Sequence, residues 1–275
     1  MIFDTETTGL PKSKTNLEKL GISITPDQPI TKISKELKSI YDFNREEKYP
    51  TVYPDILGID EQPYITQLSY VIVDEDYEIV FCYNEYIKLP EHVEVTSDIT
   101  NKTGITKEIC QTKGVDIVEA LKVYISWFFK CDRIVGHNIN FDKTLIRFEI
   151  KRHYEELLET YPYLNVVYSN TYDRISALDY FDTMIRGNRI CGIMIPKKTG
   201  EGTKLKPPKL EEMYKIFFHK TPKNLHNSMV DVLITMRCYL KLLGSHRDVD
   251  DSYFEDLVKK AVSGKEICGH LTEFA

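Results

Sequence analysis

The 275-residue sequence lacks long apolar runs and closely spaced cysteine pairs. Crossing a bilayer takes about 18–20 consecutive apolar residues, and no run in this sequence approaches that length. The first residues are too charged for a secretory signal peptide. We therefore expect an intracellular protein without a membrane partner, in the cytoplasm or nucleus, or in the host cell if the source is a virus.

Its six cysteines are scattered along the chain, with no Cys-x-x-Cys pair among them: Cys82, Cys110, Cys131, Cys191, Cys238 and Cys268. Disulfide frameworks and zinc sites usually show such pairs, so we expect neither. Reduced, mostly buried thiols are the simplest interpretation.

The sequence also lacks an excess of positive charge. The 36 lysines and arginines are outnumbered by 42 acidic residues, which gives a net charge of −6. Such a balance argues against a protein that holds nucleic acid by bulk electrostatics. It leaves open an enzyme that meets phosphates through a bound metal ion.

The chain is long enough to bury a full core but short for two large domains. We predict one domain over residues 1–275, with an insertion at 12–62, a basic loop at 186–208 and a C-terminal extension at 244–275. The insertion follows the first strand and is long for a connection inside a compact domain. Apolar residues at helical spacing predict an amphipathic helix near residues 29–43.

Strand and helix patterns alternate along the rest of the chain. A strand at residues 1–6 and a hairpin at 65–73 and 78–89 are followed by a helix near 114–128. A buried strand at 133–136 then leads into a helix that ends near residue 158. A short strand at 178–184, helices at 210–218 and 228–243, and one more helix after residue 248 complete the prediction. This order favours an α/β fold with helices on both faces of a sheet.

Two carboxylates lie within the predicted first strand. Asp4 and Glu6 are two residues apart, so both point to the same face of an extended strand. Like charges held together in a partly buried site repel, and a hard cation relieves that cost. Mg²⁺ or Mn²⁺ suits such oxygen ligands. Gly9 and Pro11 then force a turn.

Further acidic residues stand at the ends of other predicted elements. Asp142 follows the strand at 133–136, and Asp231 lies in the first turns of the helix at 228–243. Asn227 or Ser228 can cap that helix, which leaves His226 in the loop entering it. Four carboxylates and an imidazole suit two-metal phosphodiester hydrolysis, in which a neutral histidine accepts the proton of the attacking water.

At these residues the sequence resembles the DEDDh, or DnaQ-like, 3′-5′ exonucleases, which share the RNase H-like fold. Its three motifs are FDTETTGL at residues 3–10, HN with FD at 137–142, and His226 followed by Asp231. Weaker similarity covers residues 65–68, 103–106, 181–183 and 209–211 in the same order. The resemblance implies a mixed five-stranded sheet with helices on both faces and one insertion after the first strand.

The resemblance also implies the catalytic roles. Asp4, Glu6 and Asp231 would bind a first divalent cation, Asp4 also a second, and Asp142 would hold the second through water. His226 would be the general base. His137, in contrast, is expected to make local hydrogen bonds and not to bind metal.

The pocket for the 3′-terminal nucleotide would be lined by Thr7, Thr8 and Leu10, with Ile105 on the other side of the base and Asn138 nearby. Because the insertion starts beside this pocket, it either caps a sheet edge or overhangs the entrance. We favour the overhang, which would select single-stranded 3′ ends.

The expected function is therefore a metal-dependent 3′-5′ exonuclease that releases nucleoside 5′-monophosphates from DNA or RNA. Two alternatives stay open. One is an RNA-trimming exoribonuclease or oligoribonuclease, and the other is a catalytically silent module that docks on a polymerase or replication complex.

Overall fold

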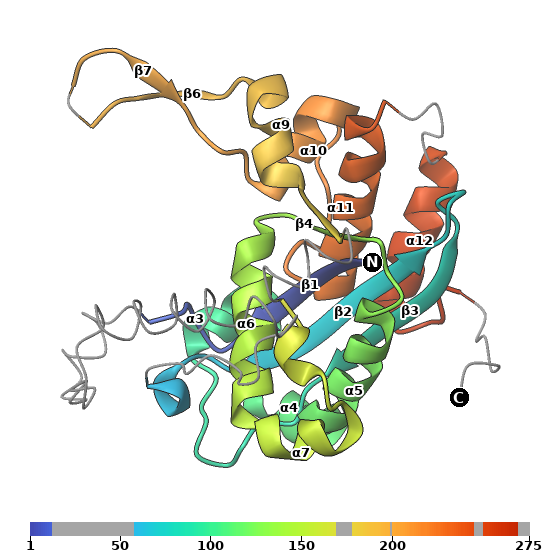
Figure 1. Ribbon diagram of the computed structural model, residues 1–275. Coiled ribbons are helices and arrows are strands. Elements are labelled where there is room, and N and C mark those ends of the chain that lie inside the picture. Colours follow the sequence, from blue (N-terminus) through green and yellow to red (C-terminus); the bar gives the residue numbers. More distant parts are fainter. Residues whose placement is uncertain (13–57, 169–177, 199, 245–249, 269–275) are drawn as a thin grey trace, which may run out of the picture.

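Figure 1 shows the computed structural model of the chain, which describes residues 1–12, 58–168, 178–198, 200–244 and 250–268. Most of the predicted insertion, including the predicted helix at residues 29–43, lies outside the described residues. Among those residues that are described, no helix is both long enough and apolar enough to span a membrane.

Five strands form a mixed sheet in the order β3-β2-β1-β4-β5. Their bounds are β1 Ile2–Thr7, β2 Ile65–Val73, β3 Ile79–Tyr86, β4 Arg133–Gly136 and β5 Asp179–Asp182. β1 is antiparallel to β2 and parallel to β4, β2 and β3 are antiparallel, and β4 and β5 are parallel. The predicted five-stranded α/β fold of the RNase H-like class is confirmed.

Helices cover both faces of this sheet (Figure 1). One layer contains α5 Ile117–Phe128, α6 Ile139–Arg152 and α7 Tyr154–Thr160, and the other contains α10 Leu210–Phe218, α11 Ser228–Leu242 and α12 Asp251–Ser263. Side chains alternate along β1, so Phe3 packs against Tyr124 of the first layer with ring centroids 5.7 Å apart. Ile2 lies in the second core with Met229 of α11. Both faces of the central strand are thus buried.

The remaining elements are α3 Ser97–Thr103, α4 Lys107–Lys113, α9 Thr183–Cys191, the short strands β6 Met194–Pro196 and β7 Thr203–Leu205, and 3-10 turns at Ile59–Glu61 and Leu164–Val166. The sequence patterns did not predict α3 or α4. Each is only seven residues long, too short for a clear apolar period, although Thr96 and Thr106 cap their first turns.

Several predicted boundaries are wrong. The predicted basic loop at 186–208 instead contains most of α9 and the whole β6–β7 hairpin. The strand predicted at 178–184 stops at Asp182, whose side chain accepts hydrogen bonds from Met184 N and Ile185 N and so caps α9. The helix predicted to run to residue 158 is broken at His153 into α6 and α7.

Within the predicted C-terminal extension, α12 packs into the core. In α12 the side chains of Phe254, Leu257 and Ala261 are buried and pack in the same cluster as α11. The expectation of mostly buried thiols is also wrong in part. All six cysteines are free, but only Cys110 and Cys238 are buried.

Candidate active site

The site is built on β1, which carries acidic side chains on one face. Asp4 and Glu6 pair in antiparallel register with Ser69 and Gln67 of β2. The residue between them, Thr5, points to the opposite face and is buried. The predicted alternation therefore places both carboxylates on the α11 side of the strand.

The first turn of α11 is fixed against this strand. Ser228 Oγ donates a hydrogen bond of 2.8 Å to the carbonyl oxygen of Asp4, and Ser228 N donates one of 3.5 Å to Gln67 Oε1. Asn227 caps the helix by accepting from Val230 N at 3.3 Å. Through these contacts the sheet sets the position of every side chain in the first turns of α11.

His226 and Asp231 are held together just at this helix start. His226 has a left-handed backbone, with φ of 66°, and its N–H donates to Asp231 Oδ2 at 3.1 Å. One potential ligand atom from each of Glu6, His226 and Asp231 lies within 4.8 Å of the other two. The predicted histidine, one β1 carboxylate and the α11 carboxylate thus converge on one centre.

Asp142 approaches from α6 in the other layer. Its Oδ1 accepts two hydrogen bonds from Thr5, from N at 3.0 Å and from Oγ1 at 2.7 Å. The N-terminus of α6 is itself anchored, because Asp182 accepts from Asn138 N and Ile139 N at 3.1 and 3.2 Å. Thr5 therefore ties Asp142 to the backbone between the two acidic residues of β1.

Burial and mutual repulsion hold protons on this cluster. Burial, followed by the charges of Asp142, Asp231 and Glu6, raises the pKa of Asp4 well above its usual range. Burial, followed by the charge of Asp231, raises the pKa of Glu6 to about 8. Burial also raises the pKa of Asp142 and of Asp231 to about 7 each.

The pKa of His226 shifts in the opposite direction. Burial is the main cause that lowers its pKa, and the positive charge of Lys102 adds to it. The imidazole is therefore neutral near pH 7 and able to accept a proton.

The donor set fits a hard divalent cation. Asp231 Oδ1 is buried without a hydrogen-bond partner among the described residues, although a buried carboxylate oxygen is normally satisfied. Carboxylate oxygens are the ligands that Mg²⁺ and Mn²⁺ prefer, and a cation would stabilise these buried carboxylates and offset the repulsion that contributes to the raised pKa values of Asp4 and Glu6. Glu6 and Asp231, together with Asp4 and Asp142, are the residues that could hold it.

The residues expected to line the nucleotide pocket lie in different environments. Leu10 is 77% exposed beside the site. Thr7 Oγ1 donates to Gly9 O at 2.7 Å, and Thr8 Oγ1 accepts from Tyr64 N at 3.0 Å, so both hydroxyls already shape the turn. Asn138 is exposed at the start of α6, where its side chain makes no capping hydrogen bond.

Ile105 does not reach the surface. It is only 2% exposed and packs in a small core with Leu89, Val93 and Cys110. The side chain of Ile105 is thus turned into the protein, and its contact with a substrate base stays a prediction.

His137 makes two hydrogen-bond contacts away from the carboxylates. Its Nδ1 lies 3.0 Å from Thr183 Oγ1 and its Nε2 lies 3.1 Å from Pro208 O. It is not part of the potential ligand cluster found among the described residues. The expectation of local hydrogen bonds was wrong, since both partners are distant in sequence.

The sequence patterns missed three residues at the site. Thr5 and Ser228 position the acidic residues, and exposed Lys102, near the end of α3, lowers the pKa of both Glu6 and Asp231. Thr5 lies inside the first motif, and Lys102 directly precedes the weaker similarity at 103–106. Nearness to a motif was the available signal for Thr5 and Lys102. It does not reveal which site residue each of them affects.

Comparison with known proteins identifies the family of the chain. The sequence model of the RNase_T family, described as an exonuclease, matches residues 1–239. No curated protein matches the chain. Among solved structures, E. coli exonuclease I in complex with a dT13 oligonucleotide is 18% identical, with a TM-score of 0.49, over 74% of this chain and 42% of that one. An exonuclease I from Methylocaldum szegediense is 16% identical, with a TM-score of 0.47, over 94% of this chain and 42% of that one. The chain thus spans about two fifths of the length of these proteins.

Proposed function

Because the chain belongs to the RNase_T exonuclease family, of the DEDDh type, we propose that it removes nucleotides from 3′ ends of DNA or RNA as nucleoside 5′-monophosphates. Membership of the family makes it a nuclease that acts on nucleic acid. The 3′-5′ direction, the use of two cations and the preference for single strands belong to the proposal.

The observation that carries the proposal is the convergence of two carboxylates, those of Glu6 and Asp231, on His226. Glu6 and Asp231 meet the imidazole within 4.8 Å, and Asp142 is fastened to the backbone between Asp4 and Glu6. Two Mg²⁺ or Mn²⁺ ions bound by these oxygens would neutralise the carboxylates and stabilise charge on the scissile phosphate.

The chain's own residues have separate tasks in this scheme. His226, neutral near pH 7, accepts the proton of the attacking water. Ser228 and Thr5 position α11 and Asp142 relative to β1. Exposed Leu10 offers an apolar surface for the terminal base, and Thr7 and Thr8 fix the turn that presents it.

The experiment uses DNA and RNA oligonucleotides labelled at either end, with Mg²⁺, with Mn²⁺ and with excess chelator. We expect a 5′-labelled strand to shorten one nucleotide at a time and a 3′-labelled strand to release a labelled mononucleotide at once, in both cases only with metal.

Asp142→Asn should lose this activity, whereas Glu159→Gln, an exposed change on α7, should keep it. Internal cleavage, release from the 5′ end, or full activity in chelator would contradict the proposal. Comparing DNA with RNA then decides whether the enzyme is an exoribonuclease. Docking on a polymerase or replication complex stays a prediction.

A further inference from the structure

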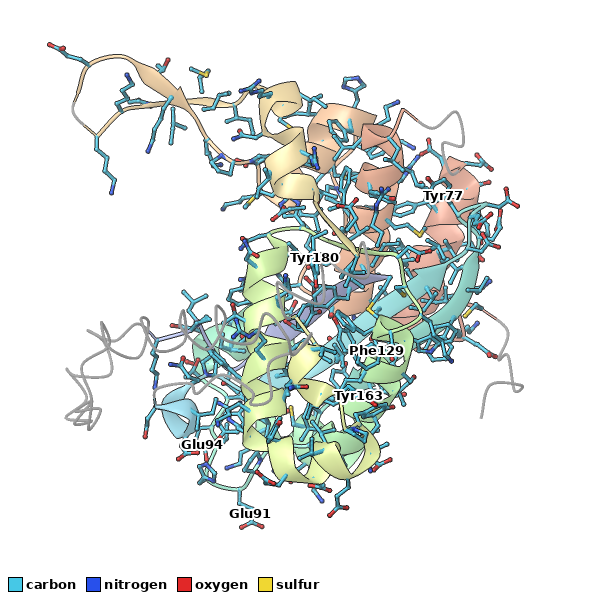
Figure 2. The ribbon with its side chains drawn as sticks, in the orientation of Figure 1. Tyr77, Glu91, Glu94, Phe129, Tyr163 and Tyr180 are labelled. Carbon is cyan, nitrogen blue, oxygen red and sulfur yellow. The ribbon has the colours of Figure 1, made fainter. Side chains whose placement is uncertain are left out.

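A β-hairpin between α9 and α10 extends away from the body of the molecule (Figure 1). We call residues 192–206 the arm. Its strands pair Met194 with Leu205 and Pro196 with Thr203, and Lys206 N donates to Ile193 O at 2.8 Å across its base. In Figure 2 the side chains of the arm stand clear of the other layers. Nothing in the described core packs around its tip, so the arm has no evident role in stability.

The arm is positively charged in a chain whose net charge is negative. Lys197, Lys198 and Lys204 are exposed, and Glu201 is the one acidic residue within 192–206. Lys206 is paired with Glu212 and is left out of this count. The exposed part therefore carries three positive charges against one negative charge, which suits a polyanion.

Apolar side chains are exposed beside these lysines. Met194 is 52% exposed and its cross-strand partner Leu205 is 39% exposed. A ribbon that combines cations with exposed aliphatic surface can contact both the phosphates and the sugars of a nucleic acid. An acidic or purely apolar protein partner would use only one of these features.

The segments on both sides of the arm contact the start of α6. At the C-terminal end, Pro208 O lies 3.1 Å from Nε2 of His137, one residue before α6 begins its capping turn. On the N-terminal side, α9 lies between the arm and Asp182, whose side chain caps α9 and accepts hydrogen bonds from the backbone at the start of α6. The same helix carries Asp142. The arm thus joins the body of the molecule through two segments that contact the start of α6, while its tip projects outward.

We propose that the arm binds the phosphate backbone of the nucleic acid upstream of the 3′ end that occupies the carboxylate cluster. This inference rests on the proposed function and adds a second contact region to it. From Ile193 to Gly200 the chain advances seven residues, or at most about 23 Å at a strand rise of about 3.3 Å. With one phosphate per about 3.4 Å of each DNA strand, that length spans about seven phosphates. Oligonucleotides of four nucleotides are therefore too short to use the arm fully.

The test compares two triple variants. The arm variant combines Lys197→Gln, Lys198→Gln and Lys204→Gln, and the control variant combines Lys113→Gln, Lys259→Gln and Lys265→Gln. The control lysines are exposed on or next to α4 and α12, away from the arm. Both variants lose three positive charges, so only the location of the charges differs.

Binding is measured first, without catalysis, on a 30-nucleotide single strand in excess chelator over a range of salt concentrations. Each phosphate contact on a single strand contributes about 0.7 to the slope of log affinity against log salt. The arm variant should therefore lose about 2 from that slope and bind on the order of tenfold more weakly at low salt. The control variant should match the wild type.

Kinetics with Mg²⁺ give an independent readout. For the wild type we expect a lower KM for the 30-nucleotide strand than for a four-nucleotide strand, and this difference should disappear in the arm variant only. Equal salt slopes for the arm and control variants would overturn the inference. A wild type that hydrolyses no oligonucleotide would contradict the proposed function instead, while the binding comparison would still decide the role of the arm.

Discussion

Replacing Asp231 by asparagine should stabilise the metal-free protein at neutral and higher pH. Asparagine keeps an oxygen that can accept the hydrogen bond from His226 N, but it removes one charge from the repelling cluster. That loss should also let the pKa of Glu6 fall, because Asp231 is the main charged group that raises it.

The size of the effect follows from the pKa of Asp231, which folding raises from 3.8 to about 7. The folded protein then binds more protons than the unfolded chain between these pH values, so this carboxyl makes stability fall as pH rises through that window. At about 1.36 kcal/mol per pH unit, the whole loss is roughly 4 kcal/mol, of which roughly 3 kcal/mol falls between pH 5 and pH 8. The asparagine variant lacks this loss.

The assay is chemical denaturation of both proteins in excess chelator at pH 5 and pH 8. We expect the free energy of unfolding of the variant to gain roughly 3 kcal/mol on the wild type between the two pH values. With Mg²⁺ at pH 8 the order should reverse, because the wild type is stabilised by binding the cation. Glu159→Gln controls for an acid-to-amide change on the surface. A difference that does not vary with pH, or a variant that is less stable at pH 8 in chelator, would refute the reasoning.

Three other predictions address the remaining parts of the site. His226→Ala should lower kcat by about 10²–10⁴-fold while the protein still binds a 3′ end with Ca²⁺ present, and unchanged turnover would mean that another group accepts the proton. Ser228→Ala removes the hydrogen bond to Asp4 O and should cost about 1–3 kcal/mol in denaturation, with a weaker stabilisation by Mg²⁺. An unaltered response to Mg²⁺ would argue against its positioning role. Replacing residues 14–60 by a short Gly/Ser linker should leave the core folded, because Lys12 and Gln62 join the two ends by hydrogen bonds of 2.8 and 3.1 Å. It should also raise activity on a recessed or blunt duplex relative to a single strand, and an unchanged ratio would exclude an overhanging insertion.

The acidic residues were predictable because local rules place them. Alternation along a strand fixes the shared face of Asp4 and Glu6 whatever the rest of the chain does. A capping residue likewise marks where α11 begins, and this puts Asp231 on the helix and His226 before it. Asp142 was added to the predicted site residues because the order of the motifs along the chain resembles that of the family.

The segment of the arm was predicted as a basic loop, but its hairpin was missed for a different reason. Its strands are three residues long, and glycine and lysine between them hide any alternation of apolar and polar residues. The cross-strand pairing of Met194 with Leu205 exists only after the chain reverses, so no local pattern contains it. For Ile105 likewise, the motif gave its place in the sequence but not the burial of its side chain.

The contacts that position the carboxylates also explain why the site depends on a cation. Thr5, Ser228 and the N–H of His226 are neutral donors, so they orient oxygen atoms or the backbone without cancelling charge. Lys102 lowers the pKa of Glu6 and Asp231, yet it is exposed, and solvent screens its charge. The cost of burying these carboxylates together is therefore relieved either by protons, in line with the raised pKa values, or by bound metal. Because protons and metal compete for the same oxygens, the affinity for Mg²⁺ should increase from pH 6 to pH 8, and activity limited by metal should increase with it.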